Sequence, residues 1–458
     1  MAEAKPRKCF NRMGRKLNIL VIYVMNKYPM RATLWDQLYC FRHYSHHNCF
    51  YLNLSVRSVP WYLKKIKFDL IVFGTVFLAN RVVAEWFEPV LEKARALKSL
   101  DATKIAFPQD EHSHTNILMD FLEEFEIDTV FSVGPQSEWP KLYDRSRFEH
   151  VKFFNVLTGY LNDATIGRIE KLAASAPERD IDIGYRTWLP GAWLGRHGLL
   201  RKQIADVFQE NAPARKFKTD ISTRSEDTLW GDDWYKFLLR CKYTISVEGG
   251  SSVPDRDGTL RERIEAYQRQ HPHATFEEIE RDCFPGLDGT VQYIALSPRH
   301  LESCATRTCQ VLIEGKYNGI LEPGRHYIEL KRDFSNIEEV LDRMQREDLR
   351  QEITERAYRE IVETGKYTYR SFVNFVLEES LKDRPVERTS APQSVWQSSI
   401  YYWMRLSEFV SWVQVALHLH SFIPHLKGII RHALVSVFSE QTVVSVLGRF
   451  KPSKREID

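Results

Sequence analysis

Short apolar runs alternate with helical patterns along the chain as far as residue 178. Six runs each predict a buried strand, at 17–23, 50–54, 68–73, 104–107, 129–133 and 152–155. Between several of them the apolar residues recur every three or four positions, most clearly at 82–97 and 115–125, which predicts helices. Uninterrupted apolar strands that alternate with helices are typical of a parallel sheet covered on both faces.

A second set of the same kind follows a linker-like stretch at 173–180. Its strands are predicted at 181–186, 217–221, 243–247, 310–313 and 326–330, and its helices at 234–239, 336–344 and 349–362. The charged segment 258–283 predicts a helical subdomain inserted into this set. The predicted class is therefore α/β, with two Rossmann-like, doubly wound domains at 17–178 and 179–382 that face each other across a cleft.

The two ends of the chain differ from these domains. Residues 1–16 form a basic arm, and the apolar run behind it resembles a secretory signal. No small-residue cleavage motif follows closely, so a buried first strand is the better interpretation. Beyond residue 383 a linker leads to two amphipathic helical patterns, at 396–419 and 426–438. Both are too polar to predict a membrane-spanning helix.

The tail 383–458 suits a membrane surface. Trp396, Trp403 and Trp412 are of the residue type that prefers the headgroup boundary. Six basic residues suit anionic lipid: Lys427, Arg431, Arg449, Lys451, Lys454 and Arg455. The alternative is a helical hairpin that packs on the protein itself or in a dimer. We expect a cytoplasmic protein, held on the inner face of the membrane if the tail binds lipid.

Composition narrows the class further. The chain has 458 residues, of which 43% are hydrophobic and 27% charged, and its net charge is +3, so it fits a globular protein without a nucleic-acid-binding field. Seven cysteines lack zinc-ligand spacing and predict a reduced protein. Neither a Walker loop, a GxGxxG nor a GxSxG motif occurs, so ATP, dinucleotides and common hydrolase chemistry are not expected.

A cluster of acids and imidazoles follows the predicted strand 104–107. It consists of Asp110, Glu111, His112 and His114. Because the carboxyl end of a parallel strand faces the ligand crevice, these side chains are expected at the cleft. They fit a general base that accepts the proton of a hydroxyl group. A metal site at the two histidines, or a polar loop that only caps the next helix, are the alternatives.

The stretch 297–315 reads as a basic loop, a short helix with one acidic residue and a buried strand. Such a glutamate accepts hydrogen bonds from two ribose hydroxyls, and an arginine before it meets a phosphate. The alternative is an ordinary strand–helix unit with a surface glutamate. At 247–258, Glu248 and Ser251 are expected to line a ligand pocket, because Gly249 and Gly250 allow close approach of a ligand to the backbone.

This order of elements resembles the bacterial glycosyltransferases with the GT-B fold, of the family 1 or spore-maturation-like type, which act in surface polysaccharide assembly. The resemblance spans about 17–382 and is carried by 107–111, 180–208, 247–258 and 297–340. It implies two Rossmann-like domains, with the acceptor on the first and a nucleotide-diphosphate sugar on the second. It also implies metal-independent transfer without a cofactor, the nucleotide sugar being the donor substrate.

The resemblance assigns roles to single residues. Glu302 corresponds to the glutamate that binds the donor ribose, and Arg299 and Arg201 to the basic groups near the diphosphate, with Arg186 as a further candidate. Ile294 stands where many retaining members carry a second glutamate, so the stereochemical outcome stays open. The Asp-x-Asp at 255–257 fits a turn better than the metal motif of the other glycosyltransferase fold.

The leading hypothesis is a glycosyltransferase that moves a sugar to a hydroxyl of a glycan or lipid-linked acceptor. Closure of the cleft would exclude water and limit hydrolysis of the donor. A sugar-nucleotide epimerase of the same architecture and a non-catalytic sugar-nucleotide-binding protein are the alternatives. Four tryptophans fit core or loop anchors better than sugar platforms: Trp188, Trp193, Trp230 and Trp234.

Overall fold

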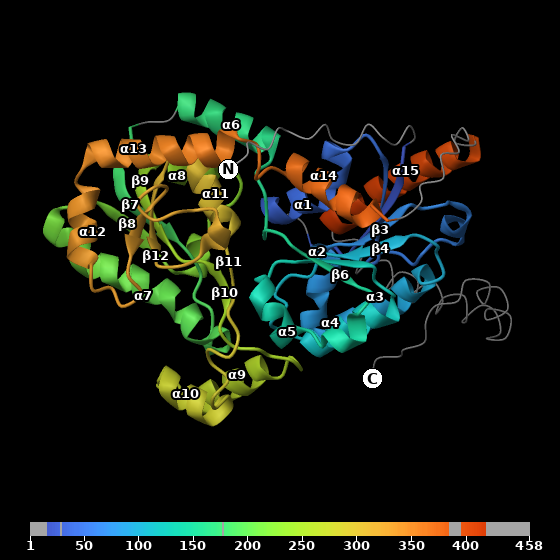
Figure 1. The fold of residues 1–458 in the computed structure, drawn as a ribbon, viewed down its shortest axis with the longest axis horizontal. Coiled ribbons are helices and arrows are strands. Elements are labelled where there is room, and N and C mark those ends of the chain that lie inside the picture. The colour runs from blue at the N-terminus through green and yellow to red at the C-terminus, as the bar shows by residue number, and fades with distance from the viewer. Residues whose placement is uncertain (1–15, 28–29, 176–177, 384–394, 418–458) are drawn as a thin grey trace, which may run out of the picture.

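The protein consists of two α/β lobes, which lie side by side along the long horizontal axis of Figure 1. The structure is a computed structural model that describes residues 16–27, 30–175, 178–383 and 395–417. The predicted basic arm, apart from its last residue, and the predicted helix 426–438 lie outside these residues. Each lobe is built on one parallel sheet, which confirms the predicted α/β class with two Rossmann-like units.

Six parallel strands form the sheet of the first lobe, in the order β2-β1-β3-β4-β5-β6. Their bounds are β1 Asn18–Tyr23, β2 Asn48–Asn53, β3 Leu70–Phe73, β4 Thr103–Ala106, β5 Thr129–Ser132 and β6 Lys152–Asn155. β1 to β5 are buried along their whole length, as their apolar sequences require. β6 lies at an edge, and its polar end residues are exposed.

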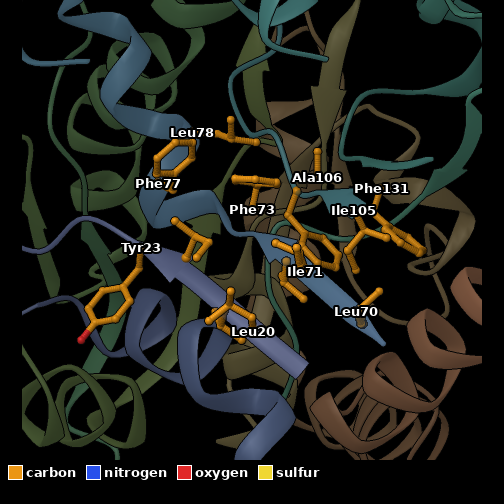
Figure 2. Packing of buried hydrophobic residues seen from close by; sticks show 14 of the residues in the cluster. Leu20, Tyr23, Leu70, Ile71, Phe73, Phe77, Leu78, Ile105, Ala106 and Phe131 are labelled. Atoms are coloured by element: carbon orange, nitrogen blue, oxygen red, sulfur yellow. The ribbon is translucent and has the colours of Figure 1, made fainter. Parts of the chain in front are cut away.

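Helices cover both faces of this sheet and enclose an aromatic core. The helices are α1 Ala32–Tyr44, α2 Thr75–Leu78, α3 Ala84–Ala94, α4 Thr115–Glu124 and α5 Trp139–Leu142. Figure 2 shows the centre of the core, where Phe73 and Phe77 lie beside the strand residues Leu20 and Ile105. Phe73 contacts Phe77 with ring centres 5.5 Å apart, and all four side chains are fully buried. The predicted strands and the helices at 82–97 and 115–125 are confirmed here.

Five parallel strands form the sheet of the second lobe, in the order β13-β12-β9-β7-β8. Their bounds are β7 Ile181–Arg186, β8 Thr219–Ser222, β9 Cys241–Ser246, β12 Cys309–Ile313 and β13 Ile328–Leu330. The helices of this lobe are α7 Gly195–Asn211, α8 Asp232–Arg240, α11 Pro298–Ala305, α12 Ile337–Met344 and α13 Glu347–Ala357. The predicted strands of the second unit are thereby confirmed to within two residues at most ends.

The predicted insertion is a small helical subdomain with its own core. It contains α9 (Leu260–Gln270) and α10 (Phe276–Cys283), which project away from both sheets in Figure 1. Ile264, Ile279 and Phe284 pack together between them. A two-stranded antiparallel ribbon of β10 (Gly249–Ser251) and β11 (Tyr293–Ala295) joins the subdomain to the second lobe.

Two helices cross from one lobe to the other, in contrast to the predicted domain limits. α6 (Asp163–Ala174) lies before residue 178, yet its Ile169 packs in the core of the second lobe. α14 (Tyr369–Leu381) lies before residue 382, yet it packs in the core of the first lobe. The crossing segments run side by side, because Leu161 and Tyr369 exchange backbone hydrogen bonds with the opposite segment. This double crossing joins the lobes behind the cleft.

The first predicted tail helix is present as α15 (Val395–Ala416), and two of its polar residues, Glu408 and Ser411, are buried against the protein. Glu408 is buried and accepts two hydrogen bonds from the guanidinium group of Arg42, at 2.9 and 2.6 Å. Arg42 lies over the Tyr51 ring, where a charge needs a partner of opposite sign. Apolar side chains occupy the outer face of α15 instead: Tyr402, Trp403, Leu406, Phe409 and Val410.

The three tail tryptophans therefore differ in position. Trp403 is exposed, whereas Trp412 is partly buried against the first core. The side chain of Trp396 and the six basic residues of the predicted lipid-binding set lie outside the described residues. None of the described helices has the length and apolar content needed to cross a membrane.

The cleft is set by the strand order. In the first sheet the order reverses between β1 and β3, and in the second between β7 and β9. Loops that leave the carboxyl ends of neighbouring strands diverge at such a reversal and open a crevice. The loops after β1 and β7 lead to Arg31 and Trp188, which line the same cavity. Both ligand-binding positions expected of doubly wound sheets therefore face each other.

The docking of α14 on the first lobe predicts a specific loss of stability. Phe372 is 3% exposed and stacks on Tyr160 with ring centres 4.6 Å apart. We expect Phe372→Ala to lower the free energy of unfolding by ~3–5 kcal/mol, measured by chemical denaturation. Phe375, 37% exposed on the same helix, is the control, and Phe375→Ala should cost ~1 kcal/mol or less. Equal losses would contradict the observed docking.

Candidate functional site

Two adjoining cavities lie in the cleft between the lobes. The Glu302 cavity has a volume of about 290 Å³ and the Arg201 cavity about 270 Å³, each named for a residue in its wall. They share one wall, made of Arg31, Thr187, Trp188, Ser297, Pro298 and Arg299. Because Arg31 belongs to the first lobe and the rest to the second, a ligand in this cleft would contact both lobes.

Five of the predicted site residues line this cleft, namely Asp110, Arg186, Arg201, Arg299 and Glu302. The other five do not reach it, namely Glu111, His112, His114, Glu248 and Ser251. The structure thus brings together four candidates for donor binding and one candidate for catalysis. Their roles stay predictions.

The start of α11 lies in the wall that the two cavities share. Ser297 precedes the helix and Pro298 occupies its first turn, where a missing N–H costs nothing. The amide of Ser297 donates to Nδ1 of His300 at 3.1 Å. Burial and the neighbouring Arg299 lower the pKa of His300 to about 3, which keeps this imidazole neutral and able to accept. Ser297 is the N-cap of this helix, and its side chain and that of His300 form a capping box that is shielded from solvent.

Arg201 and Arg299 lie together in the Arg201 cavity. Neither forms an ion pair with a carboxylate in the described part of the chain. Burial and the charge of Arg299 lower the pKa of Arg201, because two guanidinium groups in one cleft repel each other. Arg299 donates one hydrogen bond, to the backbone oxygen of Arg186 at 3.1 Å. The arrangement holds two positive charges ready for an anion.

Glu302 lies one turn further along α11 and lines the neighbouring cavity. Its Oε2 accepts from the indole N–H of Trp234 at 2.8 Å. Burial raises the pKa of Glu302, while the indole and Arg299 act in the opposite direction. One oxygen is therefore fixed by Trp234, and the carboxylate lines the Glu302 cavity. Trp234 positions the acid and is not a sugar platform.

Arg186 lines the same cavity but is already paired. It forms an ion pair with Asp220 at 2.7 Å and lies over the Phe237 ring at 4.4 Å. It is therefore a weaker anion ligand than Arg201 or Arg299. Trp188 and Trp230 are exposed in the cavity wall, and each ring lies beside a guanidinium group, that of Arg201 at 5.6 Å and that of Arg31 at 6.0 Å. Trp193 packs on the inserted subdomain.

Asp110 and Glu111 are neighbours in sequence with opposite environments. Glu111 is fully buried and accepts four hydrogen bonds, from the hydroxyls of Tyr143 and Tyr293 at 2.6 and 2.9 Å and from the amides of Val133 and Gly134. Its oxygens are occupied, so the prediction that Glu111 acts on a substrate is corrected to a structural role.

Asp110 instead turns toward the cleft, on a backbone with φ of 54°. The buried guanidinium of Arg81 donates to the backbone oxygens of Gln109 and Asp110, at 2.7 Å each, and so holds this loop in place. The left-handed conformation and the buried arginine fix the direction of the Asp110 side chain. Sequence reasoning missed Arg81, since nothing near it in the chain marks a buried charge.

His112 and His114 are also directed away from the cleft. His112 is buried against the Tyr293 ring, and burial lowers its pKa to about 4. His114 stands at the start of α4, with φ of 52°, and its amide donates to the backbone oxygen of Asp255 at 2.7 Å. The loop thus docks onto the turn at 255–257, which favours the helix-start alternative over catalysis or metal binding.

Glu248 and Ser251 support the backbone of the second lobe. Glu248 is buried and accepts from the amides of Lys316 and Tyr317 at 3.0 and 2.7 Å. Ser251 is fully buried and bonds to Val253 within its own turn. A Cβ at Gly250 would lie 1.9 Å from the backbone oxygen of Tyr293, so this glycine serves the β10–β11 ribbon. The predicted pocket role of both polar residues is corrected accordingly.

Two residues of the cavity walls were missed from sequence: Arg31 and Ser297. The signal for Arg31 is its position after β1, where the strand order of the first sheet reverses and doubly wound sheets hold ligands. Among the described residues no group of three His, Cys, Asp or Glu side chains is placed to hold a metal ion.

Comparisons with known proteins find no matching family model and no matching curated protein. TarM is 13% identical, covering 70% of this chain and 57% of that chain, with a TM-score of 0.41. An alpha-glucosyltransferase in complex with UDP and a 13-mer DNA is 11% identical, covering 80% of this chain and 100% of that chain, with a TM-score of 0.47. Anabaena Alr3699/HepE in complex with UDP and glucose is 9% identical, covering 80% of this chain and 99% of that chain, with a TM-score of 0.40. Because every score is below 0.5, the site is argued from its own geometry.

The contrast between Glu111 and Asp110 predicts different effects of the same chemical change. Glu111→Gln places an amide N–H₂ among four donors, and we expect it to lower the free energy of unfolding by ~2–3 kcal/mol. Asp110→Asn, at the cleft surface, should change it by less than ~0.5 kcal/mol. Thermal and chemical unfolding of both variants measure the difference. Equal stability of the two variants would contradict the structural role of Glu111.

Proposed function

We propose that this protein is a glycosyltransferase that uses a nucleotide-diphosphate sugar. The observation that carries the proposal is the pair Arg201 and Arg299, whose charges face one cleft without a carboxylate partner among the described residues. A diphosphate complements this positive charge, because its oxygens accept hydrogen bonds from guanidinium groups. As the glycosidic bond breaks, negative charge grows on the leaving diphosphate, and the same arginines stabilise it.

The start of α11 adds neutral donors to this site. The amide of Arg299 and the hydroxyl of Ser297 lie in the wall that the two cavities share. A helix N-terminus favours an anion through its free N–H groups and its dipole. A diphosphate at this point would touch both arginines and the helix start. The positive charge supplied by the protein fits metal-independent transfer without a cofactor.

The ribose of the nucleotide fits beside Glu302. Its carboxylate is held by Trp234 at one oxygen and lies one helical turn from Arg299, so a nucleotide could span both groups. Ribose hydroxyls are donors that suit this acceptor. Trp188 and Trp230 offer ring faces in the same cavity for the base. The nucleotide base and the sugar, expected to be a hexose, stay open.

The acceptor would enter from the first lobe. Asp110 is the one member of the predicted catalytic cluster that faces the cleft, and Arg201 lies across from it. A carboxylate there suits a sugar hydroxyl near the diphosphate. The proposed acceptor is a hydroxyl of a glycan or lipid-linked glycan, as in surface polysaccharide assembly, and the proposed location is the cytoplasmic side of the membrane.

Nucleotide binding tests this proposal. We expect isothermal calorimetry to detect UDP or GDP binding to the full chain. Glu302→Ala should weaken it by ~1–3 kcal/mol, the cost of unpaired hydroxyls. Arg201→Ala and Arg299→Ala should weaken binding of the diphosphate and leave binding of the free nucleoside unchanged, because both charges act on phosphate oxygens.

Lys202→Ala is the matched control for Arg201→Ala. Lys202 neighbours Arg201 on α7 but pairs with Asp206 at the surface, 59% exposed. Its removal should leave the affinity for UDP and GDP unaltered. If neither nucleotide binds, or if all four variants bind as the parent does, the proposed donor site is wrong.

A lipid surface is the second part of the proposal. The outer face of α15 exposes Tyr402, Trp403, Leu406, Phe409 and Val410 together with Arg405, while Glu408 faces inward. An exposed apolar face of this size marks an interaction site. Trp61 is 68% exposed next to Lys64 and Lys65, and its neighbour Tyr62 contacts Met404 of α15. Aromatic and basic residues on one surface suit the headgroup boundary of anionic lipid.

Liposome flotation tests this surface. The double variant Trp403→Glu/Leu406→Glu should lose binding to vesicles that contain anionic lipid, because two charges then oppose burial of the face. Leu287→Glu is the control, since Leu287 is 39% exposed on the inserted subdomain. Flotation of the double variant with the parent, or absence of flotation of the parent at low salt, would show that α15 does not meet a membrane.

A further inference from the structure

Arg31 belongs to the first lobe, yet it lies in the wall that the Glu302 cavity and the Arg201 cavity share. The other residues of this wall come from the second lobe. Arg31 therefore stands where a ligand that fills both cavities passes from one to the other. In the proposed function this is the point at which the ribose meets the diphosphate.

The backbone around Arg31 holds the residue at this position. Arg31 directly precedes α1, and its backbone oxygen accepts from the amides of Leu34 and Trp35 at 3.1 and 3.0 Å. Residues 38–41 of α1 are buried in the core of the first lobe. The strand order of the first sheet reverses beside β1, the strand that leads to Arg31, and doubly wound sheets bind ligands at such a reversal.

The guanidinium group of Arg31 forms no ion pair with a carboxylate among the residues that the structure describes. It lies 6.0 Å from the centre of the Trp230 ring, which belongs to the second lobe. A cation–π contact of this length at an exposed position is weak, so it directs the side chain across the cleft without neutralising its charge. The walls of the Arg201 cavity contain three arginines, Arg31 included, and one carboxylate, that of Asp110. Positive charge is therefore in excess there.

We propose that Arg31 is a third phosphate ligand of the donor, supplied by the first lobe. This inference rests on the proposed function, because it adds a ligand to the same diphosphate. Arg201 and Arg299 reach the diphosphate from the second lobe, and Arg31 reaches it from the first. The diphosphate is then bound by both lobes, whose guanidinium groups donate hydrogen bonds to its oxygens.

The third guanidinium group acts most strongly on the leaving group. In a nucleotide sugar each phosphate of the diphosphate carries one negative charge. When the bond from the anomeric carbon to the diphosphate oxygen breaks, its electron pair stays on the diphosphate, which gains a further charge. The acceptor oxygen forms the new bond to the anomeric carbon and releases its proton to water. Arg31 therefore binds the nucleoside diphosphate more strongly than the donor, and this difference lowers the barrier to transfer.

Calorimetry with a series of ligands tests this assignment without a known acceptor. The series consists of a nucleoside, its diphosphate and a nucleotide sugar, taken from the uridine or the guanosine set according to which diphosphate the parent binds more tightly. We expect Arg31→Ala to weaken binding of the diphosphate by ~10-fold or more, the loss of a charged hydrogen bond. Binding of the nucleotide sugar should weaken less, and binding of the nucleoside should stay unchanged.

Two further variants make the test specific. Arg31→Lys restores the charge without the planar fork, so it should recover part of the lost affinity for the diphosphate. Lys27→Ala is the matched control, because Lys27 is an exposed basic residue of the same loop after β1 and lines neither of the two cavities. It should bind all three ligands as the parent does. Thermal unfolding checks that each variant is folded, and Arg31→Gln replaces Arg31→Ala if that variant is not.

The outcomes separate this inference from the proposed function. If Arg201→Ala weakens binding of the diphosphate while Arg31→Ala binds it as the parent does, the donor site stands and this inference is wrong. It is also wrong if Arg31→Ala weakens the nucleoside as much as the diphosphate. An equal loss for the diphosphate and the nucleotide sugar would contradict the stronger action on the leaving group. If the parent binds neither UDP nor GDP, the proposed function fails and the inference falls with it.

Discussion

The buried carboxylate of Glu111 is the constraint on which the geometry of the cleft depends. It belongs to the first lobe, yet one of its four donors is Tyr293 of β11 in the second lobe. A carboxylate in an apolar core is stable only when its oxygens are hydrogen-bonded, so both lobes must keep this register. Asp110 on one side of this bond and Tyr293 on the other line the Arg201 cavity. Glu111 therefore ties one wall of the cleft to the other.

Around this fixed point the charges are divided between the two lobes. The second lobe presents Arg201 and Arg299 without an ion pair among the residues described, and the first lobe presents Asp110 in the same cavity, also without one. Several other charges around the cleft are paired, as in Arg186 with Asp220 and Arg42 with Glu408. The two arginines offer a position for an anion, and Asp110 offers a carboxylate on the facing wall. This division suits transfer from an anionic leaving group to a hydroxyl.

The fold was predictable from sequence to a large extent, and the site only in part. Strands buried on both faces, such as β1, must be apolar along their length, so their positions are visible in the chain. Asp110 and Glu111 are neighbours in the chain, so their local sequence does not distinguish them. Arg81 holds the backbone of Asp110 at the cleft, and Tyr293 binds the carboxylate of Glu111 in the core. Both partners lie far away in the chain. The orientation of α15 was not predictable from its sequence either, because Glu408 faces inward to meet Arg42 on α1. Long-range partners decide such cases, and a pattern along one helix does not contain them.

The central claim is that a nucleoside diphosphate binds at the start of α11. A crystal structure of the full chain with UDP or GDP tests this most directly. We expect the diphosphate oxygens within hydrogen-bond distance of Arg201, Arg299 and the hydroxyl of Ser297, and a ribose hydroxyl at the carboxylate of Glu302. A nucleotide bound away from α11, with these four side chains free of it, would contradict the account.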